Sequence, residues 1–343
     1  MVEVGKIRDR TLVLNGGYIS IFRGGKLVWK EKYMAYLLPD GNSYIYRRRV
    51  RITELSGKTL KYYQVKIEIG AGDPIFTHAR SAGEDIRFCY YPEEEMLSYW
   101  IEKYDPDAEE AIIWVKVPEI PANSEIEIYM YYGNPEVASA SDGEATFEFF
   151  DDFEKYEIDT QPSAYEKIKI GDWGSAGAGT WGVKEDDGNK VLNTDTPNNG
   201  DYGIIKIVDV SLENAVIEAK AKLVSHVDWD TIGLYARYKD TSHYIRAIGT
   251  QRDSFMEIRE TDEGTYQRLS KSFSFGVWYS LKLVCYESNA KFYIDNDMVE
   301  LSTAPVRIGE FGLWYGEANN YYDNIRIRKY TSPEPSVSIG GEE

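Results

Sequence analysis

Apolar and polar residues alternate along much of this chain, which is the pattern of β-strands that bury one face. In the first half the alternation runs through residues 49–52, 63–69, 112–118 and 125–131. Many short strands separated by turn residues predict an all-β fold made of sandwiches. The second half continues the pattern, with strand candidates at 217–223, 232–238, 244–248, 255–260, 278–286, 291–294 and 325–329.

The first 45 residues predict a smaller unit. Strand candidates at 11–14, 18–22 and 26–29 are separated by Asn-Gly-Gly and Gly-Gly, which favour hairpins. Three strands of this length bury too little apolar surface to fold alone. We therefore expect residues 1–45 to hold a homo-oligomer or to dock the protein onto a larger assembly. The alternative is that this arm folds back onto the domain that follows it.

The predicted fold class is all-β, with two β-sandwich (jelly-roll type) domains in tandem behind a small N-terminal β-meander. A Pro- and Ser-containing tail ends the chain, with room for one short edge strand at 337–339. The predicted segments are the arm at 1–45, a β-sandwich at 46–140, a small-residue linker at 141–148, a jelly roll at 149–330 and the extended tail at 331–343.

Composition and charge narrow the possible partners. The formal net charge is −18, which argues against nucleic acid held by bulk electrostatics. No run approaches 18 consecutive apolar residues, so membrane insertion is not expected.

Cys89 and Cys285 lie in different domains and in strand-like contexts, which favours buried thiols over a disulfide. Abundant Glu, Lys, Ile and Tyr with few Cys, Met and His is typical of a thermophile.

Six motifs in the first domain carry a family resemblance. They are YQV at 63–65, FTHA at 76–79, DIRF at 85–88, YWIE at 99–102, WVKVP at 114–118 and YYGNP at 131–135. In this order they resemble the archaeal and bacterial domain of unknown function 2341, over about residues 44–140. That family has no established activity. The resemblance implies a setting in surface and secreted proteins, beside carbohydrate-binding-like modules.

The second half resembles a concanavalin A-like, laminin-G-like jelly roll over about residues 149–330. The motifs that carry this resemblance are DDF at 151–153, WYSLKL at 278–283, FYIDN at 292–296 and YDNIRIR at 322–328. The resemblance implies that the first and last strands lie side by side and hold one structural calcium. Asp151, Asp152, Asp323 and Asn324 carry the oxygen ligands that calcium prefers. The alternative role for these residues is to cap turns at the strand ends.

Alternation also gathers polar and aromatic residues on one face of the second domain. Tyr235 and Arg237 share a face of their strand, and Glu257 shares one with Arg259. Sugars stack on aromatic rings and accept hydrogen bonds from arginine, so this face predicts a ligand site. Its alternative is a solvated face with cross-strand ion pairs. The predicted ligand-binding residues are Tyr235, Arg237, Tyr244, Arg246, Glu257 and Trp314.

No catalytic residues are expected. Family 16 glycoside hydrolases carry Glu-x-Asp-x-x-Glu, which supplies two carboxylates on one face of a strand. The nearest stretch here places Glu260 and Asp262 at the first spacing, but Thr265 stands where the second Glu is required.

The sequence therefore predicts a non-enzymatic surface recognition or adhesion protein whose jelly roll binds a glycan or glycoprotein. The expected location is an extracellular surface or a virion, where the protein could be part of a fibre. The start of the chain has no signal-peptide pattern, which leaves three routes open: the protein stays inside, a signal has been removed, or it leaves by another route, such as within a virus particle. Two alternatives stay open: a structural assembly protein of a particle or filament without a glycan ligand, and a glycoside hydrolase.

Overall fold

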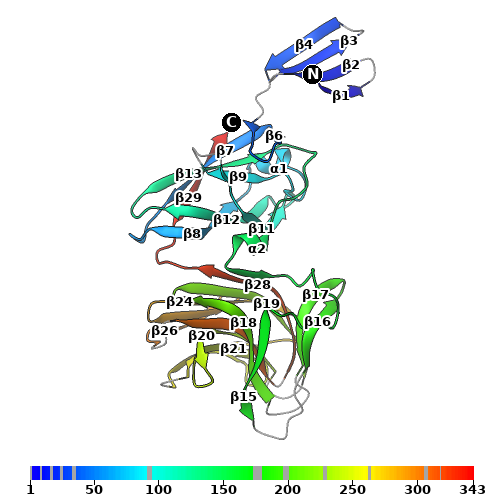
Figure 1. The fold of residues 1–343 in the computed structure, drawn as a ribbon. Helices are drawn as coiled ribbons and strands as arrows, with labels where there is room; N and C mark the ends of the chain where they lie inside the picture. Colours follow the sequence, from blue (N-terminus) through cyan, green and yellow to red (C-terminus); the bar gives the residue numbers. More distant parts are fainter. Residues whose placement is uncertain are drawn as a thin grey trace. The chain divides into compact units, whose positions relative to one another are not determined.

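The computed structural model describes the chain except Met1 and residues 8–9, 16–17, 24–25, 33–35, 91–94, 173–179, 196–200, 227–229, 262–263, 305–307 and 317. The protein is all-β, as predicted, with antiparallel sheets throughout its described part (Figure 1). It divides into two compact units. The first joins Met1–Thr146 to Pro335–Glu343, and the second is Phe147–Glu334. No helix among the described residues is long and apolar enough to span a membrane.

The N-terminal segment forms a four-stranded antiparallel sheet in chain order. Its strands are β1 (Val2–Ile7), β2 (Arg10–Asn15), β3 (Tyr18–Arg23) and β4 (Lys26–Lys32). The last three correspond to the predicted strands. The first was missed, although Val2, Val4 and Ile7 give it a partial alternation.

The rest of the first unit is a β-sandwich of a five-stranded and a three-stranded sheet, with order β10-β9-β13-β7-β29 and β11-β12-β8. A small ladder, β5-β6, and two single-turn helices complete it. The elements are β5 (Tyr36–Leu37), β6 (Ser43–Tyr44), β7 (Tyr46–Thr53), β8 (Leu60–Ile69), α1 (Ile75–His78), β9 (Arg87–Tyr90), β10 (Glu95–Met96), β11 (Tyr99–Asp105), β12 (Glu110–Ile120), β13 (Glu125–Tyr132), α2 (Gly143–Thr146) and β29 (Ser336–Glu342).

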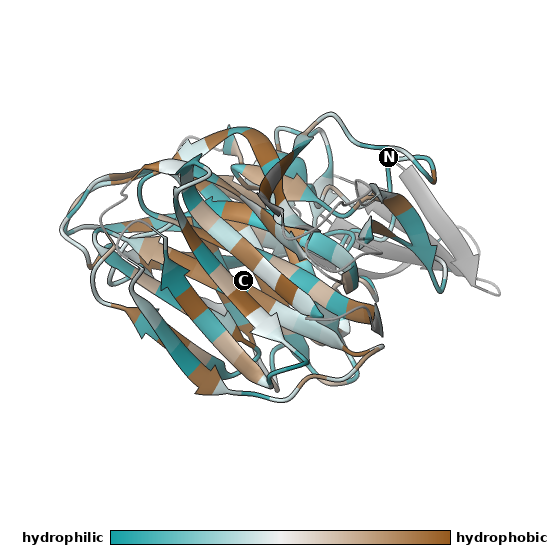
Figure 2. Cartoon of the chain, turned by 90° about the horizontal axis from the view of Figure 1, so that it is seen from below, coloured by the Kyte–Doolittle hydropathy of each residue, from teal (hydrophilic) through white to brown (hydrophobic). Residues whose placement is uncertain are grey.

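Alternation explains the core between these two sheets. Val50 and Ile52 on β7 face inward, as do Val65 and Ile67 on β8, and all are almost fully buried. The polar residues between them, Arg51 and Lys66, are exposed. Figure 2 shows hydrophilic and hydrophobic residues alternating along strands of the chain. Burying such side chains contributes roughly 1.5–3 kcal/mol each.

The YYGNP motif closes this sandwich with a buried carboxylate. Asp85 accepts backbone hydrogen bonds from Gly133 (2.7 Å) and Asn134 (2.9 Å) through one oxygen. Its other oxygen accepts from the Arg80 amide at 2.8 Å. Gly133 has φ +89, and a Cβ there would lie 2.7 Å from the Tyr46 ring. The motif therefore requires glycine at this position for both backbone and steric reasons.

The C-terminal tail completes the first unit. The predicted short strand at 337–339 is longer in the structure, where β29 pairs antiparallel with β7 at the sheet edge. Val337 and Ile339 pack against the sandwich core. The Glu342 carboxylate accepts a 2.6 Å hydrogen bond from Tyr132 Oη.

The second unit is a sandwich of an eight-stranded and a seven-stranded sheet. The first has the order β16-β17-β28-β19-β24-β25-β26, with β14 also paired to β28, and the second is β15-β18-β27-β20-β21-β22-β23. The strands are β14 (Phe149–Asp151), β15 (Tyr165–Asp172), β16 (Thr180–Asp186), β17 (Asn189–Asp195), β18 (Asp201–Leu212), β19 (Ala215–His226), β20 (Thr231–Asp240), β21 (His243–Thr250), β22 (Phe255–Glu260), β23 (Tyr266–Ser270), β24 (Trp278–Tyr286), β25 (Asn289–Ile294), β26 (Asp297–Leu301), β27 (Gly309–Gly316) and β28 (Ala318–Lys329).

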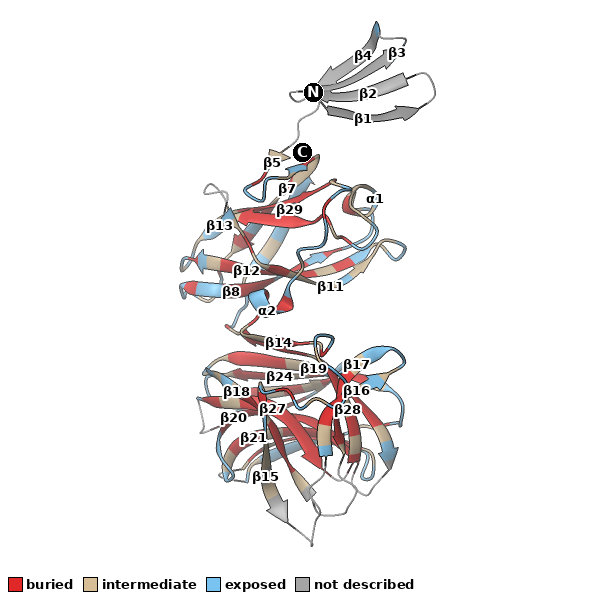
Figure 3. Ribbon diagram, turned by 45° about the vertical axis from the view of Figure 1, so that its right-hand side comes forward, coloured by how far each residue is buried: buried red, intermediate tan, exposed pale blue. Residues whose placement is uncertain are grey.

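The core of the second unit lies between these sheets. Leu281, Leu283 and Ile327 come from the larger sheet, and Leu234 and Leu313 come from the smaller one. Buried residues follow the strands of both sheets in Figure 3. The first and last strands lie side by side, since Asp151 of β14 pairs with Ile325 of β28, as the jelly-roll resemblance implied.

Candidate ligand-binding face

The seven-stranded sheet of the second unit has a second face, which we call the outer face. Along β20, β21, β22 and β27, the residues that enter the core alternate with residues that point the other way. Among the latter are five of the six predicted ligand residues, Tyr235, Tyr244, Arg246, Glu257 and Trp314, and the strand register brings them together. Tyr235 lies opposite Arg246, and Ile248, two residues after Arg246 on β21, lies opposite Glu257. Ile248 and Trp314 lie on either side of Gly233, with which both pair.

Glu257 is the centre of this face. Its side chain is fully buried and its oxygens meet three arginines. Arg246 Nη2 donates to Oε1 at 2.6 Å and Arg268 Nε donates to Oε2 at 2.7 Å. Arg259 Nε lies 3.3 Å from Oε1. Burial alone would raise the pKa of the Glu257 carboxyl, but Arg246, Arg268 and Arg259 outweigh burial and lower the pKa.

Aromatic rings surround this cluster, but most are covered. Trp314 is only 3% exposed, because Tyr202 stacks on its ring at 5.5 Å and the Arg246 guanidinium lies 5.1 Å from its centroid. Tyr235 is fully buried and lies across Gly312, where a Cβ would come within 2.6 Å of the Tyr235 hydroxyl. A glycine in mid-strand permits this close approach. These rings build the face and leave little area for stacking on a sugar.

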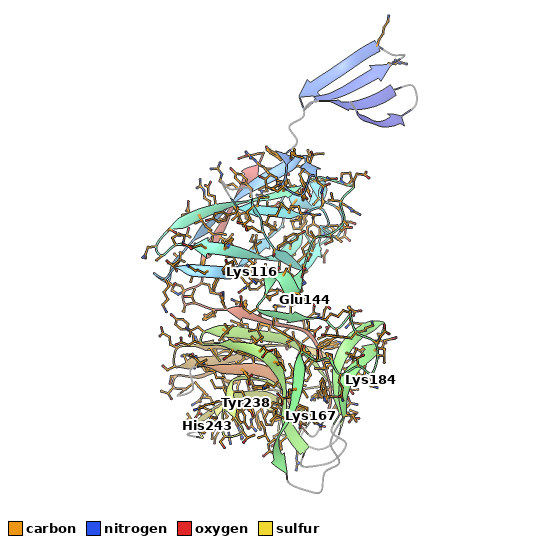
Figure 4. The ribbon with its side chains drawn as sticks, in the orientation of Figure 1. Lys116, Glu144, Lys167, Lys184, Tyr238 and His243 are labelled. Atoms are coloured by element: carbon orange, nitrogen blue, oxygen red, sulfur yellow. The ribbon has the colours of Figure 1, made fainter. Side chains whose placement is uncertain are left out.

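Tyr244 is part of the same packed layer. It is 5% exposed and lies beside Tyr238, whose ring centroid is 6.1 Å away. Tyr238 belongs to β20 and is labelled in Figure 4, near His243 at the start of β21. Burial raises the pKa of the Tyr244 hydroxyl to about 12, so this hydroxyl stays protonated and can donate.

Arg237 does not share the face of Tyr235, although simple alternation places it there. It has φ +54, and the pairing of β20 with both neighbours shifts at this point. The irregularity is a β-bulge, in which one extra residue changes the direction of the following side chains. Arg237 is fully buried, its charge acts on Cys285 of the core, and it donates to the Glu213 carbonyl at 3.1 Å. Tyr238 takes the outer position instead.

The accessible groups of the outer face are mainly guanidinium groups. The side chains of Arg246, Arg259 and Arg268 are 21%, 34% and 44% exposed, and Tyr266 is 48% exposed. Tyr266 lies 4.9 Å from the Arg259 guanidinium and 5.1 Å from that of Arg268. Sequence reasoning missed Arg268 and Tyr266, because all five residues of β23 are exposed and the strand has no apolar alternation. The available signal was that Tyr266 and Arg268 are two residues apart within residues 266–270, so a strand there would place both on one face.

A second charged group occupies the other end of the outer face. Lys206 of β18 lies 3.0 Å from Glu166 of β15 and 3.2 Å from Glu310 of β27. Lys206 lies opposite both Glu166 and Gly312 in the strand register. The outer face is therefore basic over β21–β23 and carries carboxylates over β15 and β27.

The predicted calcium residues lie where β14 meets β28. Asp151 accepts hydrogen bonds from Phe153 N (3.1 Å), Tyr156 Oη (3.1 Å) and Tyr165 Oη (3.2 Å). Asp323 accepts from the Asn324 amide at 2.7 Å and from Asn189 Nδ2 at 3.2 Å.

Burial is the main cause that raises the pKa of the Asp323 carboxyl, to about 6, and the negative charges of Asp152 and Glu154 add to it. Asp152 itself accepts from the Glu154 amide at 3.3 Å. Within the described ranges, no three His, Cys, Asp or Glu side chains are grouped as a metal site. The calcium assignment stays a prediction.

The hydrolase-like stretch has separated carboxylates. Glu257 faces outward, whereas Glu260 is fully buried and lies opposite Ile245, a core residue. Asp262 lies outside the described residues. Glu257 and Glu260 therefore do not form the pair on one face that retaining hydrolysis needs.

Comparisons with known proteins agree with parts of this description. Residues 82–176 match the family described as Domain of unknown function (DUF2341), which is the family that the motifs indicated, over a range shifted from 44–140. No curated protein sequence matches the chain.

Solved structures that are similar to part of the chain include the following three. The carbohydrate-binding module CBM66 from Bacillus subtilis is 13% identical and covers 45% of this chain and 98% of its own, with a TM-score of 0.38. A Bacteroides ovatus GH16 protein from a mixed linkage glucan locus is 16% identical, covers 52% and 99%, and has a TM-score of 0.39. A cellulose induced protein is 11% identical, covers 53% and 98%, and has a TM-score of 0.40. At such TM-scores the likenesses carry no argument for what this chain binds.

Proposed function

We infer that the protein is a non-enzymatic recognition or adhesion protein of an extracellular surface, virion or fibre, and that the outer face of its second unit binds a glycan. The observation that carries this proposal is the Arg246, Arg259 and Arg268 cluster around Glu257, with Tyr266 beside it. The cluster presents hydrogen-bond donors held by a shared carboxylate, and the exposed ring of Tyr266, on one face of a sheet. A ligand that is rich in oxygen atoms and has a ring face suits these groups.

The buried carboxylate favours binding over hydrolysis. A hydrolytic acid or nucleophile must reach the scissile bond. The Glu257 carboxyl is covered, so it cannot reach a scissile bond as a nucleophile. Arg246 and Arg268 keep its pKa low, so it is ionised at neutral pH and cannot act as the proton donor. Its role here is to hold the guanidinium groups in place, in the way that a shared carboxylate fixes arginine geometry.

A glycan array probed with the full chain tests the proposal. We expect weak binding to single glycans and stronger retention on dense ones, since such sites gain affinity through multiple copies. Substituting Arg246→Ala together with Tyr266→Ala should abolish retention. Tyr62→Ala is the matched control, because Tyr62 is 59% exposed in the first unit. No binding to any glycan, or retention unchanged in the folded double variant, would overturn the proposal.

A structural assembly role is the second candidate. The N-terminal four-stranded sheet favours it, since two edge strands, β1 and β4, end this sheet in the described part of the chain. Both roles can belong to one protein, because the arm and the outer face are formed by different residues.

A further inference from the structure

We propose that the ligand of the outer face is an anionic saccharide, whose carboxylate or sulfate group binds over β21–β23 at Arg246, Arg259 and Arg268. This inference rests on the proposed glycan-binding function and names the class of glycan. It follows from the balance of donors and acceptors in the cluster, which the overall charge of the chain does not reveal.

The cluster has more donors than its carboxylate can accept. Each guanidinium carries five N–H groups, whereas one carboxylate offers about four lone pairs. Among the residues that the structure describes, Arg246 Nη2 and Arg268 Nε are the groups that make hydrogen bonds to Glu257, at 2.6 Å and 2.7 Å. Arg259 approaches at 3.3 Å through Nε, without hydrogen-bond geometry. The side chains of Arg259 and Arg268 are among the most exposed of the described part of this face, so their terminal N–H groups can reach a ligand.

The described residues of this cluster offer few acceptors. Glu257 offers no accessible oxygen, since its side chain is fully buried. A neutral sugar hydroxyl both donates and accepts a hydrogen bond, so it needs acceptors in its site. A carboxylate or sulfate group only accepts, which matches a surface of donors. The chemistry of the cluster therefore favours an acidic sugar over a neutral one.

Local charge agrees with this choice. Three guanidinium groups against one carboxylate leave a positive cluster, in a chain whose formal net charge is −18. Bulk electrostatics would not attract a polyanion to this protein. A cluster of fixed arginines can still bind one acidic group at short range, because charge-assisted hydrogen bonds act at contact distance.

The rest of the face suggests how the saccharide lies. Cross-strand neighbours in one row are Arg259, Arg246, Tyr235, Gly312, Lys206 and Glu166, so the donors and the carboxylates occupy opposite ends of one sheet. Neighbouring strands lie about 4.8 Å apart. The acidic sugar would occupy the arginine end, and hydroxyls of adjacent sugars would meet Glu166 and Glu310.

Calorimetric titration of the full chain tests the proposal with two ligands that differ only in charge. One is an oligogalacturonate, and the other is the same oligosaccharide with its carboxyl groups reduced to alcohols. We expect the acidic form to bind at least about tenfold tighter, which is the contribution of one charge-assisted hydrogen bond. An oligoglutamate of equal charge is the third ligand, and it should bind no better than the reduced sugar.

Variants locate the site. Arg259→Gln and Arg268→Gln should each weaken binding of the oligogalacturonate about tenfold. Arg51→Gln is the control, because it removes the same charge from a half-exposed arginine of the first unit that pairs with Glu127. Arg268→Lys keeps a cation beside Glu257 and so protects the fold, but it lacks the planar fork and should also weaken binding.

The outcomes separate this inference from the function on which it rests. Equal affinity for the acidic and reduced sugars would overturn the anionic class. If Tyr266→Ala then abolished this binding, the proposal that the outer face binds a glycan would still stand. Tighter binding of the oligoglutamate would replace the saccharide with an acidic protein segment. Absence of binding to both oligosaccharides would overturn the anionic class, and the glycan proposal would fall with it only if the glycan array also showed no binding.

Discussion

Asp323 is a buried carboxylate held by neutral partners. It accepts hydrogen bonds from Asn189 and Asn324, and burial raises its pKa to about 6. Asp152 and Glu154 add negative charge around it, whereas Asp151 has Lys155 at 3.8 Å and two tyrosine hydroxyls. A divalent cation bound at Asp323 would relieve this electrostatic cost, which adds a physical argument to a calcium prediction made from the oxygen ligands and the family resemblance.

We predict that calcium raises the melting temperature of the second unit in proportion to the logarithm of its free concentration, because binding to the native state alone stabilises it. Chelator should reverse the effect. Asp323→Asn should abolish the response, because it removes the charge that attracts the cation but keeps a similar shape. Differential scanning calorimetry measures each case. Identical melting curves in calcium and in chelator would reject the site.

The residues of the outer face show what alternation can and cannot predict. It placed Arg246, Glu257 and Trp314 on one face correctly, because the period of two is a property of any regular strand. It failed at Arg237, where a bulge adds one residue to β20. It also could not show that Trp314 is covered, since burial depends on neighbours from other strands such as Tyr202.

At the scale of elements, β29 carries more weight than its position at the chain end suggests. Besides its pairing with β7, it supplies the Gly340 carbonyl to Arg48 Nε at 2.8 Å. Glu342 Oε2 lies 2.9 Å from His78 Nδ1 and accepts from Tyr132. The sequence revealed a short strand at 337–339, but its partner could not be predicted, because β7 and β29 are separated by nearly the whole chain.

We predict that a chain ending at Glu334 loses stability in its first unit only. Loss of Val337 and Ile339 from the core, of the ladder to β7 and of the Glu342 contacts should cost about 2–4 kcal/mol. Hydrogen exchange should show faster exchange in β7 and β13 and unchanged exchange in β19 and β24. The milder Glu342→Gln variant keeps the strand and should cost about 1 kcal/mol. Unaltered exchange in β7 after truncation would contradict this role.

At the scale of the whole molecule, the first unit is discontinuous in sequence. The chain leaves it after Thr146 and returns at Pro335, so the second unit is an insertion between β13 and β29. The all-β class and the presence of two sandwiches were predicted from strand spacing and turn residues. The insertion was not, because local patterns reveal strands but do not reveal which strands pair across long separations.

The N-terminal sheet is the part of the molecule whose role is tested best by removal. Leu38 and Tyr44 are buried with Tyr129 and Tyr131 of the first unit, so truncation must begin at Tyr36 to leave this cluster intact.

We predict that the full chain is a homo-oligomer or binds a larger assembly through residues 1–45. The chain beginning at Tyr36 should be a monomer with an unchanged melting temperature. Unpaired edge strands favour such pairing between subunits. Multi-angle light scattering of both chains measures the difference. A lower melting temperature in the truncated monomer would instead indicate that the arm packs on its own chain, and two equally stable monomers would rule out both roles.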